Sequence, residues 1–435
     1  MKLTIEKVVY GGQGLARIPV EQSPHGGKRV FVPYTLPGEI VEATVSEQRR
    51  GYCVAHARQI QQPSAFRATA PCPWFGQCGG CQLQHSAYPY QVEMKRNMLT
   101  ESLTRAGVRD LPAVETLTGE PWNYRNRIRL QIHWKPEFSI GYRQSRSHRL
   151  VSVAGCAIAA PLLERCIEVV SSLGRAGLLP AAVEEIEMFV NQDESSLLLT
   201  LWAHRQSVFP ADDCSHFLAA LQQQIPALAG AAVLPADKEH DPTLRPLLQW
   251  GAPGLTYRVA GWSYSVSLGS FFQINRTLLD RFVASVTAGR DGHTAWDLYA
   301  GVGLFSLPLA ERFQRLIAVE SSVSAGKDLR MNLRGAATAM TAPVVEFLRG
   351  QAGAGRAEHP DLVLLDPPRA GAGEEVCALM ARCQPQRIVY VSCDPSTLGR
   401  DLATLIQSGY WLHRLQLVDM FPQTYHLETI AELAR

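Results

Sequence analysis

The sequence lacks long apolar runs, a large excess of charge of either sign and a dense set of cysteines. No uninterrupted apolar stretch approaches the roughly 18 residues that a membrane-spanning helix needs, and Met1–Lys7 contains no apolar signal core. Lys and Arg number 42 and Asp and Glu 40, so the formal charge is only +2, and any nucleic-acid surface must be a local patch. Ten cysteines in 435 residues do not indicate a disulfide scaffold. These absences predict a cytoplasmic protein with reduced thiols, no membrane segment and no evident obligate protein partner.

Length and composition favour a globular enzyme of about three domains, because 46% of the 435 residues are hydrophobic and 19% are charged. We find no internal repeat and no low-complexity tract. We predict an N-terminal β-barrel over residues 1–62, a central α+β domain over 63–254 and a C-terminal Rossmann-like α/β domain over 255–435.

Residues 1–62 alternate apolar and polar positions between turn signals, as in Ile40–Val45, which predicts a small antiparallel, OB-like barrel. Eight Lys or Arg residues against five acidic residues give this segment a net charge of +3, which alone is weak support for RNA binding. The motifs Gly12–Arg17, Phe31–Glu39 and the basic Glu47–Tyr52 resemble a TRAM domain. That resemblance implies an RNA-binding barrel.

Three cysteines lie close together in a loop rich in Gly and Pro. Cys72, Cys78 and Cys81 are separated by five and then two residues, so their thiolates can turn toward one point. The best candidate for a fourth ligand is Cys156, which has a small residue on each side. A zinc site more usually has two CxxC pairs or a histidine pair. We favour a structural four-cysteine iron–sulfur cluster, with a zinc site and unligated cysteines as the alternatives.

A strongly basic stretch follows a predicted helix over Gln82–Ala106. Residues 122–150 contain seven Lys or Arg and one acidic residue, a net charge of +6, with aromatic residues between the arginines. Aromatic rings can stack on bases while arginines neutralise phosphates. We predict a hairpin that contacts RNA; the alternative is a hairpin with a merely solvated charged face.

The last third of the chain has the pattern of a βαβ unit. A predicted strand, Thr294–Tyr299, precedes a tight turn with Gly301 and Gly303, and the strand after the next helix ends at Glu320. Such glycines let a ligand approach the backbone at a helix N-terminus, and Glu320, 19 residues after Gly301 (320 − 301), can accept hydrogen bonds from ribose hydroxyls. Ser306 replaces the third glycine of a dinucleotide fingerprint, which favours S-adenosylmethionine (SAM) over NAD.

Two further predicted strands end in reactive side chains. Asp366 follows a buried run and precedes two prolines and Arg369, where amino-group methyltransferases have an aromatic residue, so methylation of an amino group is disfavoured. Asp366 could instead bind the cofactor or a uracil edge, and Arg369 a phosphate. Cys393 follows the apolar run Ile388–Val391, so its thiol should emerge at the carboxyl end of the sheet. A thiol there can act as a nucleophile, although a lone cysteine is more often a core residue.

Taken together, the motifs resemble the RNA (uracil-5-)-methyltransferase family over nearly the whole chain. They are the cysteines of 72–81 with Cys156, Gly269–Asn275, Asp297–Gly303, Leu365–Gly371, Val391–Pro395 and His426–Glu428. The resemblance implies that Cys393 is the nucleophile and Glu428 the base. It also implies a SAM pocket formed by Gln273, Tyr299, Gly301, Gly303, Glu320 and Asp366, with Gln351 as a looser assignment, and a helical stretch near 85–117 that packs on the catalytic domain.

The resemblance thus predicts SAM-dependent methylation of C5 of a uridine through a covalent adduct between Cys393 and C6. Family members with both the barrel and a [4Fe-4S] cluster resemble enzymes for ribosomal RNA, so 23S rRNA is preferred over tRNA as the substrate. The alternatives are a tRNA uracil-5-methyltransferase and an RNA-binding or RNA-folding protein with an idle methyltransferase domain.

Overall fold

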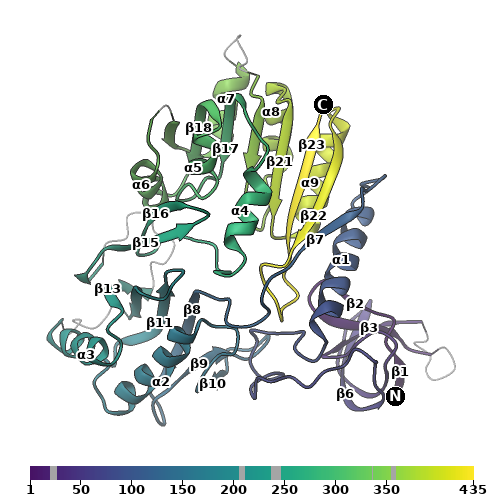
Figure 1. Ribbon diagram of the computed structural model, residues 1–435. Helices are drawn as coiled ribbons and strands as arrows, with labels where there is room; N and C mark the ends of the chain where they lie inside the picture. The colour runs from purple at the N-terminus through teal and green to yellow at the C-terminus, as the bar shows by residue number, and fades with distance from the viewer. Residues whose placement is uncertain (20–26, 205–210, 237–245, 336, 354–358) are drawn as a thin grey trace.

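The structure is a computed structural model that describes residues 1–19, 27–204, 211–236, 246–335, 337–353 and 359–435. Figure 1 shows an α/β domain at the top, a second α/β domain below it on the left and a small β domain below it on the right. In the part of the chain that is described, no helix is both long and apolar enough to cross a membrane.

The N-terminal domain is a six-stranded sheet with the order β1-β5-β6-β4-β3-β2. Its strands are β1 (Lys2–Thr4), β2 (Lys7–Val9), β3 (Gln13–Arg17), β4 (Arg29–Pro33), β5 (Ile40–Gln48) and β6 (Tyr52–Gln62). Alternate residues such as Val41 and Ala43 face a buried apolar core, as the sequence predicts. One pairing differs from an all-antiparallel barrel, because β4 and β6 run parallel.

The helix α1 (Tyr88–Arg105) begins six residues later than predicted (88 − 82). The backbone N–H groups of Gln82 and Leu83 both donate to the carbonyl oxygen of Gln423, at 3.0 and 2.9 Å, and this holds the preceding segment out of a helix. The helix packs on α9 (Pro395–Gln407), where Gly399 allows a close approach: a Cβ atom there would lie 2.6 Å from the Cβ of Ala106.

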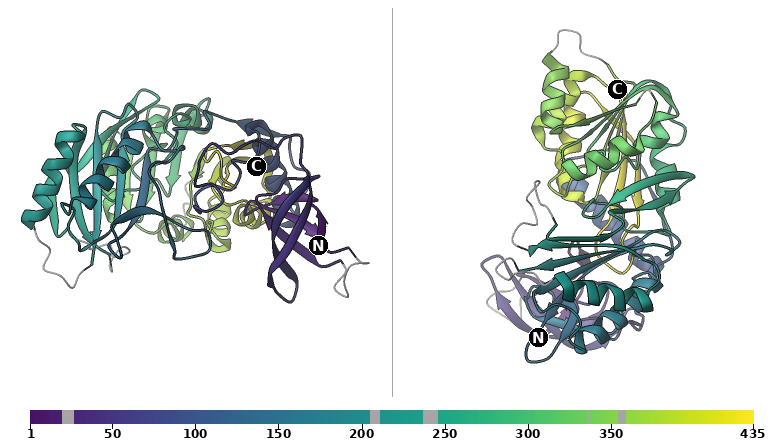
Figure 2. Two further views of the ribbon diagram at one scale, coloured as in Figure 1. Left: turned by 90° about the horizontal axis from the view of Figure 1, so that it is seen from below. Right: turned by 90° about the vertical axis from the view of Figure 1, so that its left-hand side faces the viewer.

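The central domain is a seven-stranded sheet with the order β10-β9-β8-β11-β12-β13-β14. Its strands are β8 (Arg127–His133), β9 (Ser139–Arg143), β10 (Leu150–Ser152), β11 (Val183–Val190), β12 (Leu197–Ala203), β13 (Leu228–Pro235) and β14 (Leu248–Gly251). The helices α2 (Pro161–Arg175) and α3 (Ala211–Gln224) lie side by side and cover one face (Figure 2). Every residue of β12 is buried.

The C-terminal domain contains an eight-stranded sheet with the order β19-β18-β17-β20-β21-β23-β22-β7. Its strands are β7 (Val114–Leu117), β17 (Gly292–Leu298), β18 (Phe313–Glu320), β19 (Ala337–Thr341), β20 (Leu362–Leu365), β21 (Arg387–Ser392), β22 (Trp411–Val418) and β23 (Glu428–Ala434). The strand β23 runs antiparallel between β21 and β22. Because β7 comes from the segment after α1, that segment is part of this domain's sheet.

Helices cover both faces of this sheet, as expected for a doubly wound α/β fold. Residues of α1, α7 (Val344–Gly353), α8 (Glu374–Cys383) and α9 share one apolar core, and those of α4 (Leu279–Thr287), α5 (Ser306–Ala310) and α6 (Val323–Asn332) share the other. A hairpin of β15 (Gly254–Val259) and β16 (Trp262–Ser267) adjoins the second core. The carboxyl ends of the parallel strands point toward the other two domains (Figure 1).

Candidate active site

The Cys393 thiol lies in the turn between β21 and α9. Asp394 caps the helix: its Oδ1 accepts hydrogen bonds from the N–H groups of Ser396 and Thr397, at 2.9 and 3.1 Å, and Pro395 occupies the first helical turn. An N-cap carboxylate and an early proline both fix the start of a helix. The turn is therefore well defined, and its cysteine is partly exposed at the carboxyl end of the sheet.

Glu428 is the first residue of β23, beside this turn. Its neighbour Thr429 is paired with Ser392 across the antiparallel ladder, so Cys393 and Glu428 lie at the same end of adjacent strands. The Glu428 side chain is buried, and its Oε1 has no hydrogen-bond partner among the described residues. A buried acceptor without a partner is costly, which marks the group as a candidate for chemistry.

Burial and mutual repulsion set the charge states of the site. Burial, followed by the negative charges of Glu428 and Asp366, raises the pKa of the Cys393 thiol to about 12, against the opposing charge of Arg369. Burial and the charge of Asp366 raise the pKa of Glu428 well above its usual range. Burial, followed by the charge of Asp297, raises the pKa of Asp366 to about 7. A thiol and two carboxyls thus lie close enough to influence one another, as groups that exchange protons must.

The predicted cofactor residues are mostly gathered next to this cluster. Both oxygens of Glu320 accept backbone hydrogen bonds, Oε2 from Gly301 N at 2.8 Å and Oε1 from Ser322 N at 2.6 Å. Gln273 Nε2 donates to Asp366 Oδ2 at 3.3 Å. These contacts pull the glycine turn, the end of β18 and the end of β20 together at the carboxyl edge.

The backbone of the glycine turn is unusual. Tyr299, Gly301 and Gly303 have φ angles of 62°, 56° and 94°, and a Cβ atom on Gly303 would lie 2.9 Å from Leu329 Cδ1. Glycine is therefore needed at 303, and the left-handed Tyr299 is a strained position of the kind found at ligand sites.

Gln351 is not brought to this site. It lies in the last turn of α7, which follows β19 and returns toward the start of β20. Since all three elements belong to a parallel α/β arrangement, the last turn of α7 lies near the amino ends of the strands, and the predicted cofactor contact of Gln351 is not supported.

Asp297 is a site residue that the sequence analysis did not single out. It is buried near the end of the strand β17 and accepts a hydrogen bond from Ser306 Oγ. Its Oδ1 has no partner among the described residues. Burial, partly offset by Ser306, raises the pKa of Asp297 to about 7. An acidic residue two positions before a glycine turn was the available signal.

The loop that leads to Glu428 is held by α1. Lys95 Nζ donates to Asp419 Oδ1 at 2.6 Å and to the Phe421 carbonyl oxygen at 2.9 Å, and the Lys95 and Asp419 side chains are both fully buried. Gln91, one helical turn earlier, exchanges hydrogen bonds with Gln423. Polar residues at positions i and i+4 on the buried face of a helix could have signalled this role.

The four predicted cluster cysteines line one cavity of about 370 Å³, together with Arg369 and His426 of the active-site region. As the side chains stand, no group of three or more His, Cys, Asp or Glu residues in the described ranges is close enough to hold a single metal ion. The four cysteines therefore share one cavity.

The basic stretch is less free than its composition suggests. Arg127 and Arg129 pair with Glu187 and Glu185 of β11, acidic partners that lie about 60 residues later and were invisible to a local charge count. The hairpin end, 143–148, lines a groove of about 930 Å³, and its Arg143 also lies 3.5 Å from Glu185. That groove also contains residues of the N-terminal domain, the cysteine loop and the 425–426 segment, so all three domains meet there.

Comparisons with known proteins agree with this arrangement. Residues 256–435 match the family described as tRNA (Uracil-5-)-methyltransferase, and residues 1–57 match the TRAM domain. The chain is 34% identical over 442 residues to the 23S rRNA (uracil(1939)-C(5))-methyltransferase RlmD of Chromohalobacter salexigens, covering 100% of this chain and 89% of that protein. It is 33% identical over 450 residues to the protein of the same name from Pectobacterium atrosepticum, covering 99% and 93%.

The fold is similar to that of a solved structure, Pyrococcus abyssi tRNA (uracil-54, C5)-methyltransferase in complex with S-adenosyl-L-homocysteine. The TM-score is 0.77 at 23% identity, and 100% of both chains is covered. With its TRAM domain and α/β catalytic domain, this chain belongs to the RNA (uracil-5-)-methyltransferase family.

Proposed function

We propose that this protein methylates C5 of a uridine in 23S rRNA, with SAM as the methyl donor, Cys393 as the nucleophile and Glu428 as the base. The observation that carries the proposal is the placement of Cys393 and Glu428 at the same end of paired strands, beside the glycine turn and Glu320. The rRNA substrate is supported by the relatives named for 23S rRNA, which match over the whole chain.

The chemistry requires both a nucleophile and a base. C5 of uracil is too electron-poor to attack a methyl sulfonium, so the sulfur of Cys393 first bonds to C6, and the ring electrons move toward O4. The thiol must lose its proton in this step, and the Asp366 carboxylate, whose pKa burial raises to about 7, is a suitable acceptor. Bound SAM supplies an electrophilic methyl group, which C5 then takes. Glu428 finally removes the C5 proton, the bond between sulfur and C6 breaks, and the thiolate is restored.

Six residues would hold SAM, and the chemistry of Glu320 and of the glycine turn indicates what each would do. Glu320 Oε2 uses one lone pair for the Gly301 N–H and keeps another for ribose hydroxyls, while the glycine turn allows the cofactor to approach the backbone. The pocket comprises Gln273, Tyr299, Gly301, Gly303, Glu320 and Asp366.

The cysteine cavity fits a [4Fe-4S] cluster held by Cys72, Cys78, Cys81 and Cys156. Four cysteine thiolates are the usual ligands of such a cluster, and a zinc site would more usually include a second CxxC pair or a histidine pair. The support for this proposal is that all four cysteines line one cavity of about 370 Å³. In addition, Gly80 N donates to Cys78 Sγ at 3.4 Å, a contact that stabilises a thiolate. The cluster would be structural and would join the cysteine loop to the central domain.

RNA would lie in the groove between the domains. Arg143 and Arg146 approach it from the central domain, and the 10–13 turn approaches it from the TRAM domain. The target uridine must leave its stack to expose C5 and C6, at a cost of a few kcal/mol, which contacts along this groove would offset.

The decisive test is transfer of a labelled methyl group from SAM to unmodified 23S rRNA and to tRNA, followed by digestion to nucleosides. We expect label in 5-methyluridine from rRNA and none with Cys393→Ala. The whole-chain likeness to a tRNA methyltransferase makes tRNA the second candidate, and label in tRNA alone would establish it. RNA binding without any transfer would instead identify an idle methyltransferase domain.

A further inference from the structure

The side chain of Tyr10, in the TRAM domain, contacts the turn that carries the nucleophile. Tyr10 follows β2, and its hydroxyl donates to Asp394 Oδ2 at 3.2 Å and lies 3.5 Å from the Cys393 carbonyl oxygen. Asp394 uses its other oxygen to cap α9. A residue 384 positions away in the sequence thus occupies the free oxygen of the carboxylate next to the proposed nucleophile.

The same tyrosine contacts the segment that leads to the proposed base. Its ring packs edge-on against Tyr425, with centroids 5.4 Å apart, and Tyr425 in turn lies 4.1 Å from His426. The turn after Tyr10 is fitted closely here, because a Cβ atom on Gly12 would lie 2.8 Å from Gln82 Cβ and 3.3 Å from Tyr425 Cβ. Tyr10 therefore bridges the two segments that carry the reactive groups.

The turn that holds Tyr10 also forms a wall of the groove between the domains. Gly11, Gly12 and Gln13 line the groove opposite the 143–148 loop, together with Tyr425 and His426. A polyanion bound in this groove would contact the turn whose Tyr10 is hydrogen-bonded to Asp394. Chains of packed side chains of this kind can carry coupling between two sites.

We propose that Tyr10 is a positioning residue, which holds the Cys393–Asp394 turn in its reactive geometry when RNA fills the groove. The inference rests on the proposed function, in which Cys393 attacks C6. Small displacements of a reacting atom lower rates steeply, so a hydrogen bond that fixes the carbonyl of the nucleophile and its neighbouring carboxylate affects the attack step more than it affects RNA affinity.

The test compares Tyr10→Phe with Tyr410→Phe. Both changes remove one hydroxyl that is bonded within the protein, but Tyr410 donates to the Pro385 carbonyl oxygen, at 2.9 Å, away from the site. RNA affinity and single-turnover methylation are measured on the unmodified transcript, 23S rRNA or tRNA, that accepts methyl groups. Adduct formation is measured on the same transcript made with 5-fluorouridine, whose C5 fluorine cannot be removed as a proton and so keeps the adduct intact.

We expect Tyr10→Phe to slow adduct formation roughly tenfold, the effect of losing one hydrogen bond to a charged group, with RNA affinity unchanged and Tyr410→Phe equal to wild type in both assays. Weaker RNA binding with an unchanged maximal rate would overturn the proposal in favour of a simple RNA contact. Equal slowing in both variants would show a general loss of stability and would also overturn it.

Cys393→Ala, run in parallel, separates this inference from the proposed function. If that variant still methylates RNA, the proposed function fails, and positioning of the thiol fails with it. If Cys393→Ala is inactive while Tyr10→Phe matches wild type, only the role of Tyr10 is refuted.

Discussion

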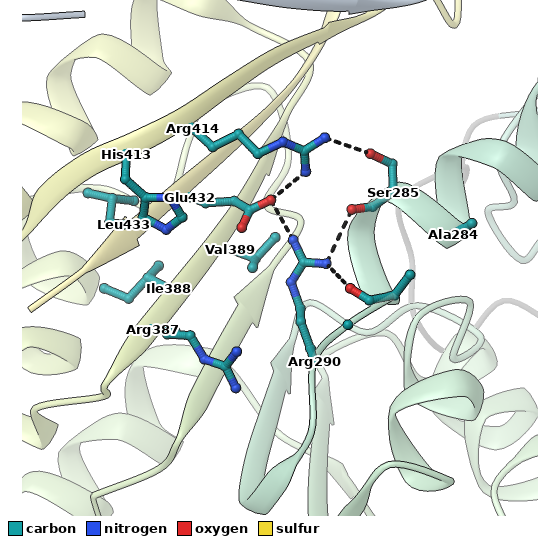
Figure 3. Close-up of a pocket in the computed structure, with 12 residues that line it drawn as sticks. Ala284, Ser285, Arg290, Arg387, Ile388, Val389, His413, Arg414, Glu432 and Leu433 are labelled. Carbon is teal, nitrogen blue, oxygen red and sulfur yellow. Dashed lines mark hydrogen bonds and ion pairs between the residues drawn. The ribbon is translucent and has the colours of Figure 1, made fainter. Parts of the chain in front are cut away.

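Two glutamates on β23 project from the same face of the sheet, but one is paired with arginines and the other has no ionic partner among the described residues. Glu428 and Glu432 are four residues apart, so both side chains project from one face. Glu432 accepts from Arg290 at 2.5 Å and from Arg414 at 2.6 Å, in a cavity of about 390 Å³ at the amino end of β21 (Figure 3). Glu428 lies beside the carboxyl end of β21. It has no ion pair among the described residues, and its Oε1 has no hydrogen-bond partner there.

The difference suits Glu432 to a structural role and Glu428 to a role in the reaction. A carboxylate held between two arginines ties α4 to the sheet, and its proton affinity serves no reaction. An unpaired buried carboxylate is unfavourable for folding, and once ionised it binds a proton strongly. One end of β23 therefore stabilises the fold, and the other end provides a group for proton transfer.

The largest effect should come from Glu428→Gln. Because the amide cannot accept the C5 proton, we expect turnover to fall roughly 10²- to 10⁴-fold, while addition to C6 and methyl transfer continue. The enzyme should then accumulate covalently bound, methylated RNA, visible as a retarded band in denaturing gels. Normal turnover, or a loss of adduct together with turnover, would assign Glu428 a different role.

Glu432→Gln is the matched substitution at the other end of the strand. It leaves Arg290, whose side chain is 7% exposed, without its anionic partner, and we expect a loss of roughly 2–3 kcal/mol in the free energy of unfolding. The rate per folded molecule should stay near that of wild type. Denaturant unfolding and single-turnover assays on the same preparation check both parts, and a stable but inactive Glu432→Gln would break the comparison.

Sequence patterns could predict the features that depend on local signals, but not the contacts between residues far apart in the chain. The α/β order, the TRAM domain and the strand-end position of Cys393 depend on local signals, namely apolar runs ended by Gly, Pro or Asp. The pairing of Lys95 with Asp419 joins residues 324 positions apart, and no local pattern reports such a contact. The same holds for the acidic partners of Arg127 and Arg129, which pair two of the seven basic residues of the stretch.

A smaller effect is expected in the pH profile of Asp366→Asn. The charge of Asp366 is a cause of the raised pKa of Glu428, so removing it should make Glu428 easier to ionise. The acid limb of the single-turnover rate, measured at saturating SAM, should then move toward lower pH. The amide also removes the proposed acceptor of the thiol proton, so the plateau rate should fall. An unchanged midpoint would show that the two carboxyls titrate independently.

The smallest effect concerns Asp297, a third buried carboxyl at the catalytic end. Its pKa is raised by burial from 3.8 to about 7, so the folded protein holds a proton there that the unfolded chain releases. Its contribution to stability is therefore complete below about pH 4 and is lost as the pH rises toward 7. Asp297→Asn has no such titration. The melting temperature of the variant relative to wild type should be a few degrees higher at pH 8 than at pH 5, whereas a difference independent of pH would mean that Asp297, like Glu432, is structurally satisfied.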